Sequence, residues 1–176
     1  METKEYRTMD KSKWRPGSWQ HEPDKIQWQD QSTGLPCLIV RNSMGALCGY
    51  VGVAEGHPWF GMKYSRGKVT GCNEDCDHEN DYHYACSPAA NLNVHGGITF
   101  SDFCQPHDTE SEGICHLPGA GEPERVYWFG FDCAHYGDEI PGLDSHMNCG
   151  GSDYRDIEYV KAEVCSLALQ LAQVRA

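Results

Sequence analysis

The 176-residue sequence has little positive charge and no long apolar run. Lys and Arg number 14 against 26 Asp and Glu, so the formal net charge is −12. Affinity for duplex nucleic acid comes from Lys and Arg that neutralise phosphates, so this charge balance excludes a duplex-binding protein. Apolar stretches such as Cys37–Val40 are far shorter than the about 18–20 residues that cross a bilayer. We therefore expect neither a membrane nor duplex nucleic acid as partner.

A secretory signal is also not expected, because Met1–Gly17 contains no apolar core segment. The protein is then expected to be soluble and cytoplasmic, where thiols stay reduced, so the ten cysteines predict no disulfide framework. They are interpreted as buried small side chains or as metal ligands. Cys37, Cys48 and Cys165 stand among Leu, Ile, Val and Ala, which predicts that they lie in the core.

The chain divides into a polar N-terminal segment and one domain. Residues 1–33 are rich in turn residues, and their tryptophans follow neither helix nor strand spacing, which predicts a surface wrap. Residues 34–176 are predicted to form a single α+β domain. Its predicted strands are Cys37–Arg41, Ala46–Val53, Asn91–Thr99 and Arg125–Cys133, of which the first two form a hairpin and the last is central. Residues 54–87 and 101–124 are expected to be loops, because they are broken by glycine and proline.

Periodicity is clearest at the C-terminal end, over Tyr154–Val174. The apolar residues recur at alternating steps of three and four: Ile157, Val160, Val164, Leu167, Leu171 and Val174. This spacing predicts an amphipathic helix of about six turns that packs across the sheet. The alternative is that the same stripe forms the seam of a homodimer. The predicted fold is thus α+β: a small, mostly antiparallel sheet with long loops and one long C-terminal amphipathic helix.

A cysteine- and histidine-rich segment is a candidate zinc site. Three thiols and two imidazoles fall within fifteen residues, and the predicted ligands are Cys72, Cys76, His83 and Cys86. Only the first two have the spacing of a tight zinc knuckle, and loop cysteines without a metal are the alternative. Further donors could come from a second loop that contains Cys104, His107, Cys115 and His116.

The segment VHGGITFS places an imidazole, His95, beside the bare backbone of Gly96 and Gly97. Glycine lets a ligand approach the N–H groups closely and allows positive φ. Together with the hydroxyls of Thr99 and Ser101, the segment predicts a site for an anion or the edge of a nucleotide. The alternative is a strand-ending turn that contains a histidine.

A second polar segment follows the strongest predicted strand and contains Asp132, His135 and Asp138. A carboxylate at a strand end is partly desolvated, and a histidine paired with it would shift both pKa values towards those useful in proton transfer. The alternative is a hydrogen-bonded turn that closes the strand. We expect this segment and the His95 segment to converge on one pocket.

Four motifs, LPCLIVRN, GALCGYVGV, VHGGITF and WFGFDCAHYGD, resemble a family of small accessory proteins of tailed bacteriophages. The resemblance covers the chain from about residue 14 onward and is most specific in the last two motifs. It implies expression in the cytoplasm of an infected bacterium. It also implies a role against host defence, because many small phage proteins capture or degrade nucleotide immune signals. It assigns no role to any residue.

Three functions from different classes remain open. The first is capture of a small nucleotide-like ligand, with predicted binding residues Gly96, Gly97, Thr99, Ser101, His57, Trp59, Tyr136 and Arg41. The second is a hydrolase in which His95 and His135 act as base and acid and Asp132 orients an imidazole, or in which Asp132, His135 and Asp138 hold a metal. The third is a zinc-stabilised protein-interaction module. Ligand capture is the first hypothesis.

Overall fold

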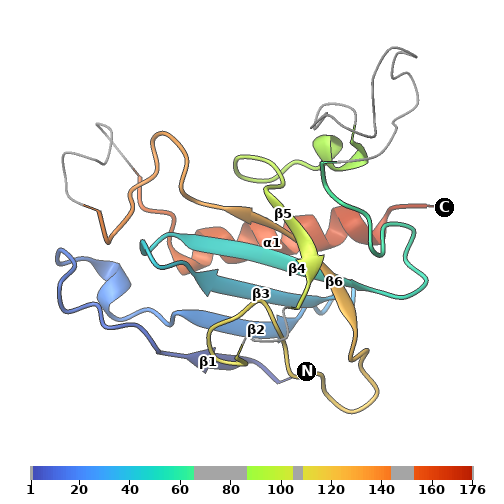
Figure 1. Cartoon of the computed structure of the whole chain (residues 1–176), viewed down its shortest axis with the longest axis horizontal. Coiled ribbons are helices and arrows are strands. Elements are labelled where there is room, and N and C mark those ends of the chain that lie inside the picture. Colours follow the sequence, from blue (N-terminus) through green and yellow to red (C-terminus); the bar gives the residue numbers. More distant parts are fainter. Residues whose placement is uncertain (1, 66–86, 105–108, 144–152, 176) are drawn as a thin grey trace.

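The computed structural model describes residues 2–65, 87–104, 109–143 and 153–175, and it shows a six-stranded sheet with one helix across one face (Figure 1). The strand order is β1-β2-β3-β4-β6-β5, and each neighbouring pair is antiparallel. The elements are β1 (Lys4–Tyr6), β2 (Lys25–Gln29), β3 (Pro36–Arg41), β4 (Leu47–Ala54), β5 (Phe100–Phe103), β6 (Val126–Asp132) and α1 (Ile157–Ala172), with short 3-10 turns at Ser18–Gln20 and Pro88–Asn91. The predicted α+β class is confirmed. No helix among the described residues is long and apolar enough to cross a membrane.

The predicted β3–β4 hairpin and the central position of β6 are both confirmed. The hairpin turn is held by Asn42, whose Oδ1 accepts hydrogen bonds from the N–H groups of Met44 at 3.0 Å and Ala46 at 3.1 Å. Strand β6 lies between β4 and β5, which explains its apolar residues on both faces. Local turn chemistry and apolar content were sufficient signals for these strands.

The predicted strand over Asn91–Thr99 is wrong. Pro88–Asn91 forms a 3-10 turn, and the following residues turn through Gly96 and Gly97, whose φ values are +66° and +82°. Positive φ at two successive residues is incompatible with a pleated strand. The strand comes later, as β5, at the start of the segment that was expected to be a loop.

The N-terminal segment is more than a surface wrap. Residues 25–29 form β2, which pairs along its length with β3, so Gln27 lies opposite Leu38. The expected boundary between residues 33 and 34 therefore falls within the connection between two neighbouring strands of one sheet. Strand β2 was not predicted because two of its alternate residues, Lys25 and Gln27, are polar, although both side chains are buried.

Helix α1 begins at Ile157 rather than at Tyr154, because Asp156 caps it by accepting a hydrogen bond from the N–H of Tyr159 at 2.9 Å. Its apolar residues Val160, Val164, Leu167 and Leu171 are fully buried in the cluster that joins the helix to the sheet. This stripe is covered by the chain's own sheet, as predicted for a helix that packs across it.

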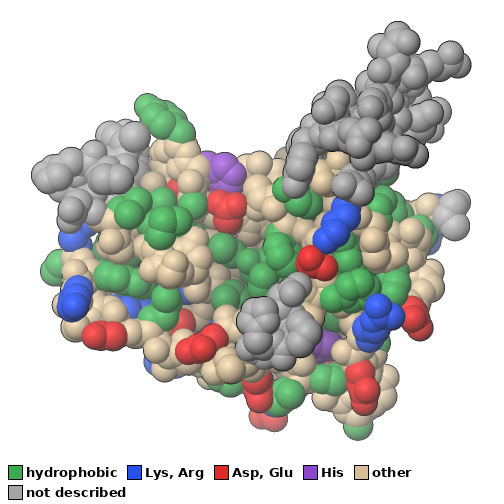
Figure 2. All heavy atoms as spheres, viewed as in Figure 1, with side chains coloured by type: hydrophobic (Ala, Val, Ile, Leu, Met, Phe, Trp, Pro, Cys, Tyr) green, Lys and Arg blue, Asp and Glu red, His purple; other side chains and the backbone are tan. Residues whose placement is uncertain are grey.

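The opposite face of the sheet carries a second apolar cluster, formed by Leu38, Val40, Cys48, Tyr50, Val126 and Trp128, with Phe100 and Ile114 packed against it. Figure 2 views the molecule from this side and shows apolar side chains over the middle of the sheet, with charged side chains mostly towards its periphery. Residues 109–118 run over this face as an irregular segment, here called the covering loop.

Buried polar side chains of β2 hold the covering loop in place. Lys25 Nζ donates to the carbonyl oxygens of Glu110 at 2.5 Å, Gly113 at 2.6 Å and Cys115 at 2.6 Å. Three acceptors around one nitrogen match the three donors of an ammonium group. Gln27 pairs with the backbone of Leu117 in both directions, at 2.8 and 3.0 Å.

A disulfide joins Cys104, after β5, to Cys115 in the covering loop. The expectation of reduced cysteines is therefore wrong for this pair, and its sulfurs are not available as metal ligands while the bond is intact. The free cysteines among the described residues are Cys37, Cys48, Cys133 and Cys165. Of the three predicted core cysteines, Cys37 and Cys48 are buried and Cys165 is half-buried.

Replacing Lys25 by methionine is expected to lower the free energy of unfolding by about 2–4 kcal/mol, because three loop carbonyls lose their donors inside the fold. Urea denaturation would measure it. The matched control is Lys13→Met, which removes the same charge from an exposed side chain and should change stability by less than about 0.5 kcal/mol. Equal effects for both variants would contradict the structural role of Lys25.

Candidate functional site

The two histidines expected to converge, His95 and His135, meet although they lie forty positions apart in the sequence. Their ring centroids are 5.4 Å apart with the planes at 66°. His95 comes from the turn after the Pro88–Asn91 helix, and His135 from the turn after β6. Both approach Asp138, so the three side chains form one group, here called the His95–His135–Asp138 cluster.

Asp138 is the centre of this cluster, with its side chain only 1% exposed. Its Oδ2 accepts hydrogen bonds from His95 Nε2 at 2.7 Å and from the backbone N–H of His135 at 3.0 Å, and its Oδ1 accepts from Arg155 Nε at 2.9 Å. Burial by itself raises the pKa of this carboxyl. The hydrogen bonds from His95, Arg155 and the His135 amide outweigh burial, so the pKa lies below its ordinary value of 3.8.

Residues of α1 fix the orientation of His95. Its Nδ1 lies 3.0 Å from Tyr159 Oη, and its backbone N–H donates to Glu163 Oε2 at 2.8 Å. Both ring nitrogens therefore have a partner, one in Asp138 and one in Tyr159. In this arrangement neither nitrogen of His95 is free to act as a general base on a substrate.

His135 is held less completely. Its Nδ1 is buried but has no hydrogen-bond partner among the described residues. The nearest carboxylate oxygens lie beyond hydrogen-bonding distance, at 3.7 Å for Asp138 Oδ2 and 3.9 Å for Asp132 Oδ1. A buried polar atom left in this state is uncommon in folded proteins and calls for a partner.

Gly96 lies against the imidazole of His135. A Cβ at Gly96 would overlap the imidazole of His135, so this glycine lets the two segments pack against each other. Thr99 joins the cluster indirectly: its hydroxyl donates to Asp132 Oδ2 at 2.8 Å, and the N–H of Ala134 donates to Asp132 Oδ1 at 3.1 Å. Asp132 is thus a positioned carboxylate beside His135.

Three predicted ligand-binding residues are engaged elsewhere. His57 Nε2 lies 2.9 Å from the carbonyl oxygen of Leu171, in the last turn of α1. Trp59 packs against Phe129, and Ser101 is buried, where its hydroxyl bonds to Tyr64 and Tyr127. These hydrogen bonds are 2.8 and 3.2 Å long.

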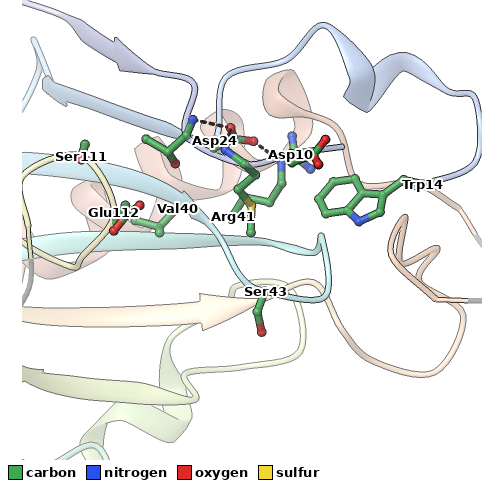
Figure 3. Close-up of a pocket in the computed structure, with 10 residues that line it drawn as sticks. Asp10, Trp14, Asp24, Val40, Arg41, Ser43, Ser111 and Glu112 are labelled. Carbon is green, nitrogen blue, oxygen red and sulfur yellow. Dashed lines mark hydrogen bonds and ion pairs between the residues drawn. The ribbon is translucent and has the colours of Figure 1, made fainter. Parts of the chain in front are cut away.

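Arg41 is also occupied. Its side chain is fully buried, and its guanidinium contacts Asp24 Oδ1 at 3.2 Å, Glu22 Oε2 at 2.7 Å and Tyr154 Oη at 2.9 Å. In Figure 3, Arg41 lies beside Asp24 in the wall of a cavity of about 380 Å³, with Trp14 towards one side. All its charge is used within the fold, so it does not form a phosphate site with Gly96 and Gly97.

Tyr136, one of the predicted ligand-binding residues, remains accessible. It directly follows His135 and is 90% exposed. The predicted zinc ligands Cys72, Cys76, His83 and Cys86 lie outside the described residues.

The His95–His135–Asp138 cluster could hold a metal ion, because its three candidate ligand atoms all lie within 4.8 Å of one another. Metal ligands are usually oriented by further hydrogen bonds. Here Arg155 bonds to the second oxygen of Asp138, and Tyr159 bonds to the second nitrogen of His95. Asp132, predicted as a ligand in the metal-assisted alternative, lies beside this group.

Sequence reasoning missed the supporting residues Arg155, Tyr159 and Glu163. Their spacing in the sequence was a signal, because the three residues are four positions apart. This spacing places Tyr159 and Glu163 on one side of α1 and continues to Arg155, just before the helix. That spacing indicates a shared face but names no partner, and only the fold brings His95 and Asp138 to it. Comparisons with protein-family models, curated proteins and solved structures found no match to this chain.

Replacing Gly96 by alanine is expected to displace His135 and to cost about 2–4 kcal/mol, because the added methyl adds steric overlap to the strain of positive φ. The histidine ring resonances in an NMR spectrum and the urea midpoint would report these changes. The matched control is Gly34→Ala, at φ +72° with open space around the new methyl, which should cost only about 1–2 kcal/mol. Equal costs, with unmoved His135 resonances, would contradict the packing described.

Replacing Asp138 by asparagine is expected to lower stability by about 2–3 kcal/mol at pH 7, because Arg155 loses its charged partner. The folded pKa of Asp138 is depressed, so its stabilising contribution is present above the ordinary value of 3.8 and is lost as the pH falls through the lower folded value. The difference between parent and variant should therefore shrink below pH 3.8. Urea midpoints from pH 2 to 7 measure it, and a pH-independent difference would refute it. Asp102→Asn, at a partly exposed ion pair with Lys63, is the control and should cost less than about 1 kcal/mol.

Proposed function

We propose that this protein is a metal-dependent hydrolase of small nucleotides, with a zinc ion held by His95, His135 and Asp138. The observation that carries the proposal is the buried, unpartnered Nδ1 of His135, which lies 3.7 Å from the same Asp138 oxygen that receives His95 Nε2 at 2.7 Å. A cation among these three atoms would give that nitrogen a partner and would meet a buried negative charge.

The donor set suits zinc. Imidazole nitrogens and carboxylate oxygens bind it at about 2.0–2.2 Å, so two ligands of a tetrahedral ion stand roughly 3.3 Å apart. Asp138 Oδ2 lies 2.7 Å from His95 Nε2 and 3.7 Å from His135 Nδ1, on either side of this value. Small side-chain shifts would therefore bring these atoms to zinc-binding distances. Three protein ligands with a fourth position for water are typical of catalytic zinc sites. Two histidines and one carboxylate also suit ferrous iron, so metal analysis has to read both elements.

The surroundings of His95 fit a ligand role. When its Nε2 binds a metal, the ring proton stands on Nδ1 and is donated to Tyr159 Oη. Burial and the nearby Glu163 raise the pKa of Tyr159, so its oxygen stays a neutral hydroxyl that can accept this bond. The same tyrosine can thus serve the ring in both tautomers.

Asp132 is proposed as the general base. A zinc ion would lower the pKa of a water ligand to about 7 and polarise a phosphoryl oxygen. Asp132 Oδ1 lies 3.9 Å from His135 Nδ1, and Thr99 and the Ala134 amide hold the carboxylate in place. It would take the proton of the attacking water, and as a half-exposed side chain it would pass that proton to solvent.

A nucleotide substrate is supported by two observations. Tyr136, next to His135, offers a ring that is 90% exposed, and exposed aromatic rings stack on bases. The resemblance to phage accessory proteins points to a nucleotide immune signal of the host. Hydrolysis is favoured over capture because three residues expected to bind a captured ligand are engaged within the fold. They are Arg41, Ser101 and Trp59.

Metal content tests the ligand set. The untagged parent protein and the variants His135→Gln and Asp138→Asn would be analysed for zinc and iron, and each variant should contain about one equivalent less than the parent. The controls are His21→Gln, at an exposed histidine, and Cys72→Ser with Cys76→Ser, which tests the cysteine-rich segment. Unchanged metal in the cluster variants would overturn the proposed site.

Turnover is tested with a panel of cyclic mono- and dinucleotides, followed by heat denaturation and analysis of the released compounds. The zinc-loaded parent should convert at least one of them, and Asp132→Asn should reduce the rate about 10²–10³-fold while keeping its zinc. Release of an intact nucleotide would indicate capture instead, and an Asp132→Asn variant as active as the parent would refute the assigned base.

A further inference from the structure

The disulfide between Cys104 and Cys115 is asymmetric. Cys104 is exposed, whereas Cys115, which is part of the covering loop, is only 8% exposed. In thiol–disulfide exchange an incoming thiolate attacks one sulfur and the other leaves. Only Cys104 presents its residue to such an attack, so the structure itself selects which sulfur is attacked.

A cavity of about 370 Å³ lies at the exposed side of this disulfide, and its lining includes Cys104, Glu124 and Arg125. The guanidinium of Arg125 stacks over the ring of Phe103 at 4.4 Å, which places a cation beside the residue that precedes Cys104. The protein has a net charge of −12, which repels an anionic thiolate, and Arg125 is a positive charge close to the disulfide. The cavity therefore combines an exposed disulfide with one cation, Arg125, and one carboxylate, Glu124, and the guanidinium of Arg125 also lies 3.7 Å from Glu55.

The buried side of the disulfide also has a cation. Lys25 Nζ lies 2.6 Å from the carbonyl oxygen of Cys115 and is itself buried. A buried thiolate is normally disfavoured, and burial accordingly raises the pKa of Cys48 to about 12. Lys25 fixes the backbone of Cys115, so the buried half of the disulfide is held in place while Cys104 is open to attack.

We infer that Cys104 and Cys115 form a thiol–disulfide exchange site that accepts small thiols and dithiols. The incoming thiolate attacks Cys104 Sγ, the disulfide bond breaks, and its electron pair goes to Cys115 Sγ, which leaves as a thiolate. A second thiolate attacks the incoming sulfur of the mixed disulfide and releases Cys104 as a thiolate. Two substrate thiols are then oxidised to a disulfide, and the protein is reduced to a dithiol. A low-molecular-weight disulfide such as oxidised glutathione reverses both steps.

This activity is independent of the proposed hydrolase, because the exchange site contains none of the residues of the His95–His135–Asp138 cluster. Either proposal can therefore fail without the other.

The asymmetry is tested with the two single variants Cys115→Ser and Cys104→Ser, each reduced and then treated with oxidised glutathione under native conditions. Peptide mass mapping measures the modification of each cysteine separately. In Cys115→Ser, Cys104 should form a mixed disulfide about tenfold faster or more than Cys115 does in Cys104→Ser. Buried Cys37 is the internal reference and should stay unmodified. Equal rates at the two positions, or an unreactive Cys104, would overturn the inference.

The role of Arg125 is tested on the intact disulfide. Its rate of reduction by glutathione, an anionic thiol, should fall about threefold or more in Arg125→Gln at low salt, and the difference should vanish at high salt. The rate with cysteamine, a cationic thiol, should not fall. Arg7→Gln, at an exposed arginine paired with Glu5, is the matched control. Equal slowing with both thiols would show that the variant acts through packing and would contradict the electrostatic role.

Discussion

The buried carboxylate of Asp138 holds together parts of the chain that share no sheet ladder. It accepts hydrogen bonds from the turn that carries His95, from the amide of His135 after β6, and from Arg155 just before α1. A backbone bridge between Asp138 and Asp153 runs beside these contacts. A charge buried to this degree is tolerated only when donors surround it, so each of the three segments is needed to keep the others in place. The same constraint positions the candidate site.

Buried polar groups have a similar role on the other side of the sheet. The covering loop has few apolar residues of its own, so hydrophobic burial alone would hold it weakly. Lys25 and Gln27 compensate by bonding directly to its backbone, and a disulfide closes it onto the end of β5. Arg41 likewise holds the N-terminal segment, through its ion pair with Asp24. Small sheets with long loops need such links, because each loop would otherwise leave backbone groups unsatisfied.

The arrangement around Asp138 favours the proposed metal site over the acid–base pair of histidines in the hydrolase alternative. A general base needs a free nitrogen, but both nitrogens of His95 are engaged, by Asp138 and Tyr159. A metal ligand needs one nitrogen aimed at the ion and the other held, and this is what those partners provide. In the proposed reaction the proton acceptor is Asp132, whose carboxylate is held by Thr99 and is half-exposed. Tyr136 stands next to this group as an accessible ring.

The sequence by itself determined the elements with strong local signals. The hairpin of β3 and β4, the strand β6 and the helix α1 follow from turn chemistry, apolar content and a period of three to four residues, all of which act between near neighbours. The same reasoning singled out His95, Asp132, His135 and Asp138 as polar residues next to glycines or a buried strand.

Only the tertiary structure decided which polar groups meet. Strand β2 escaped detection because its alternate residues, Lys25 and Gln27, are buried under a loop about ninety positions away. Arg41 looked available for a phosphate until the fold surrounded it with Glu22 and Asp24. The pairing of Cys104 with Cys115 likewise depends on where the covering loop lies. The physical reason is common to all of these: a charged or polar side chain is neutralised by whichever group the folded chain places within about 3 Å, and that group is not encoded in the residue's own neighbourhood.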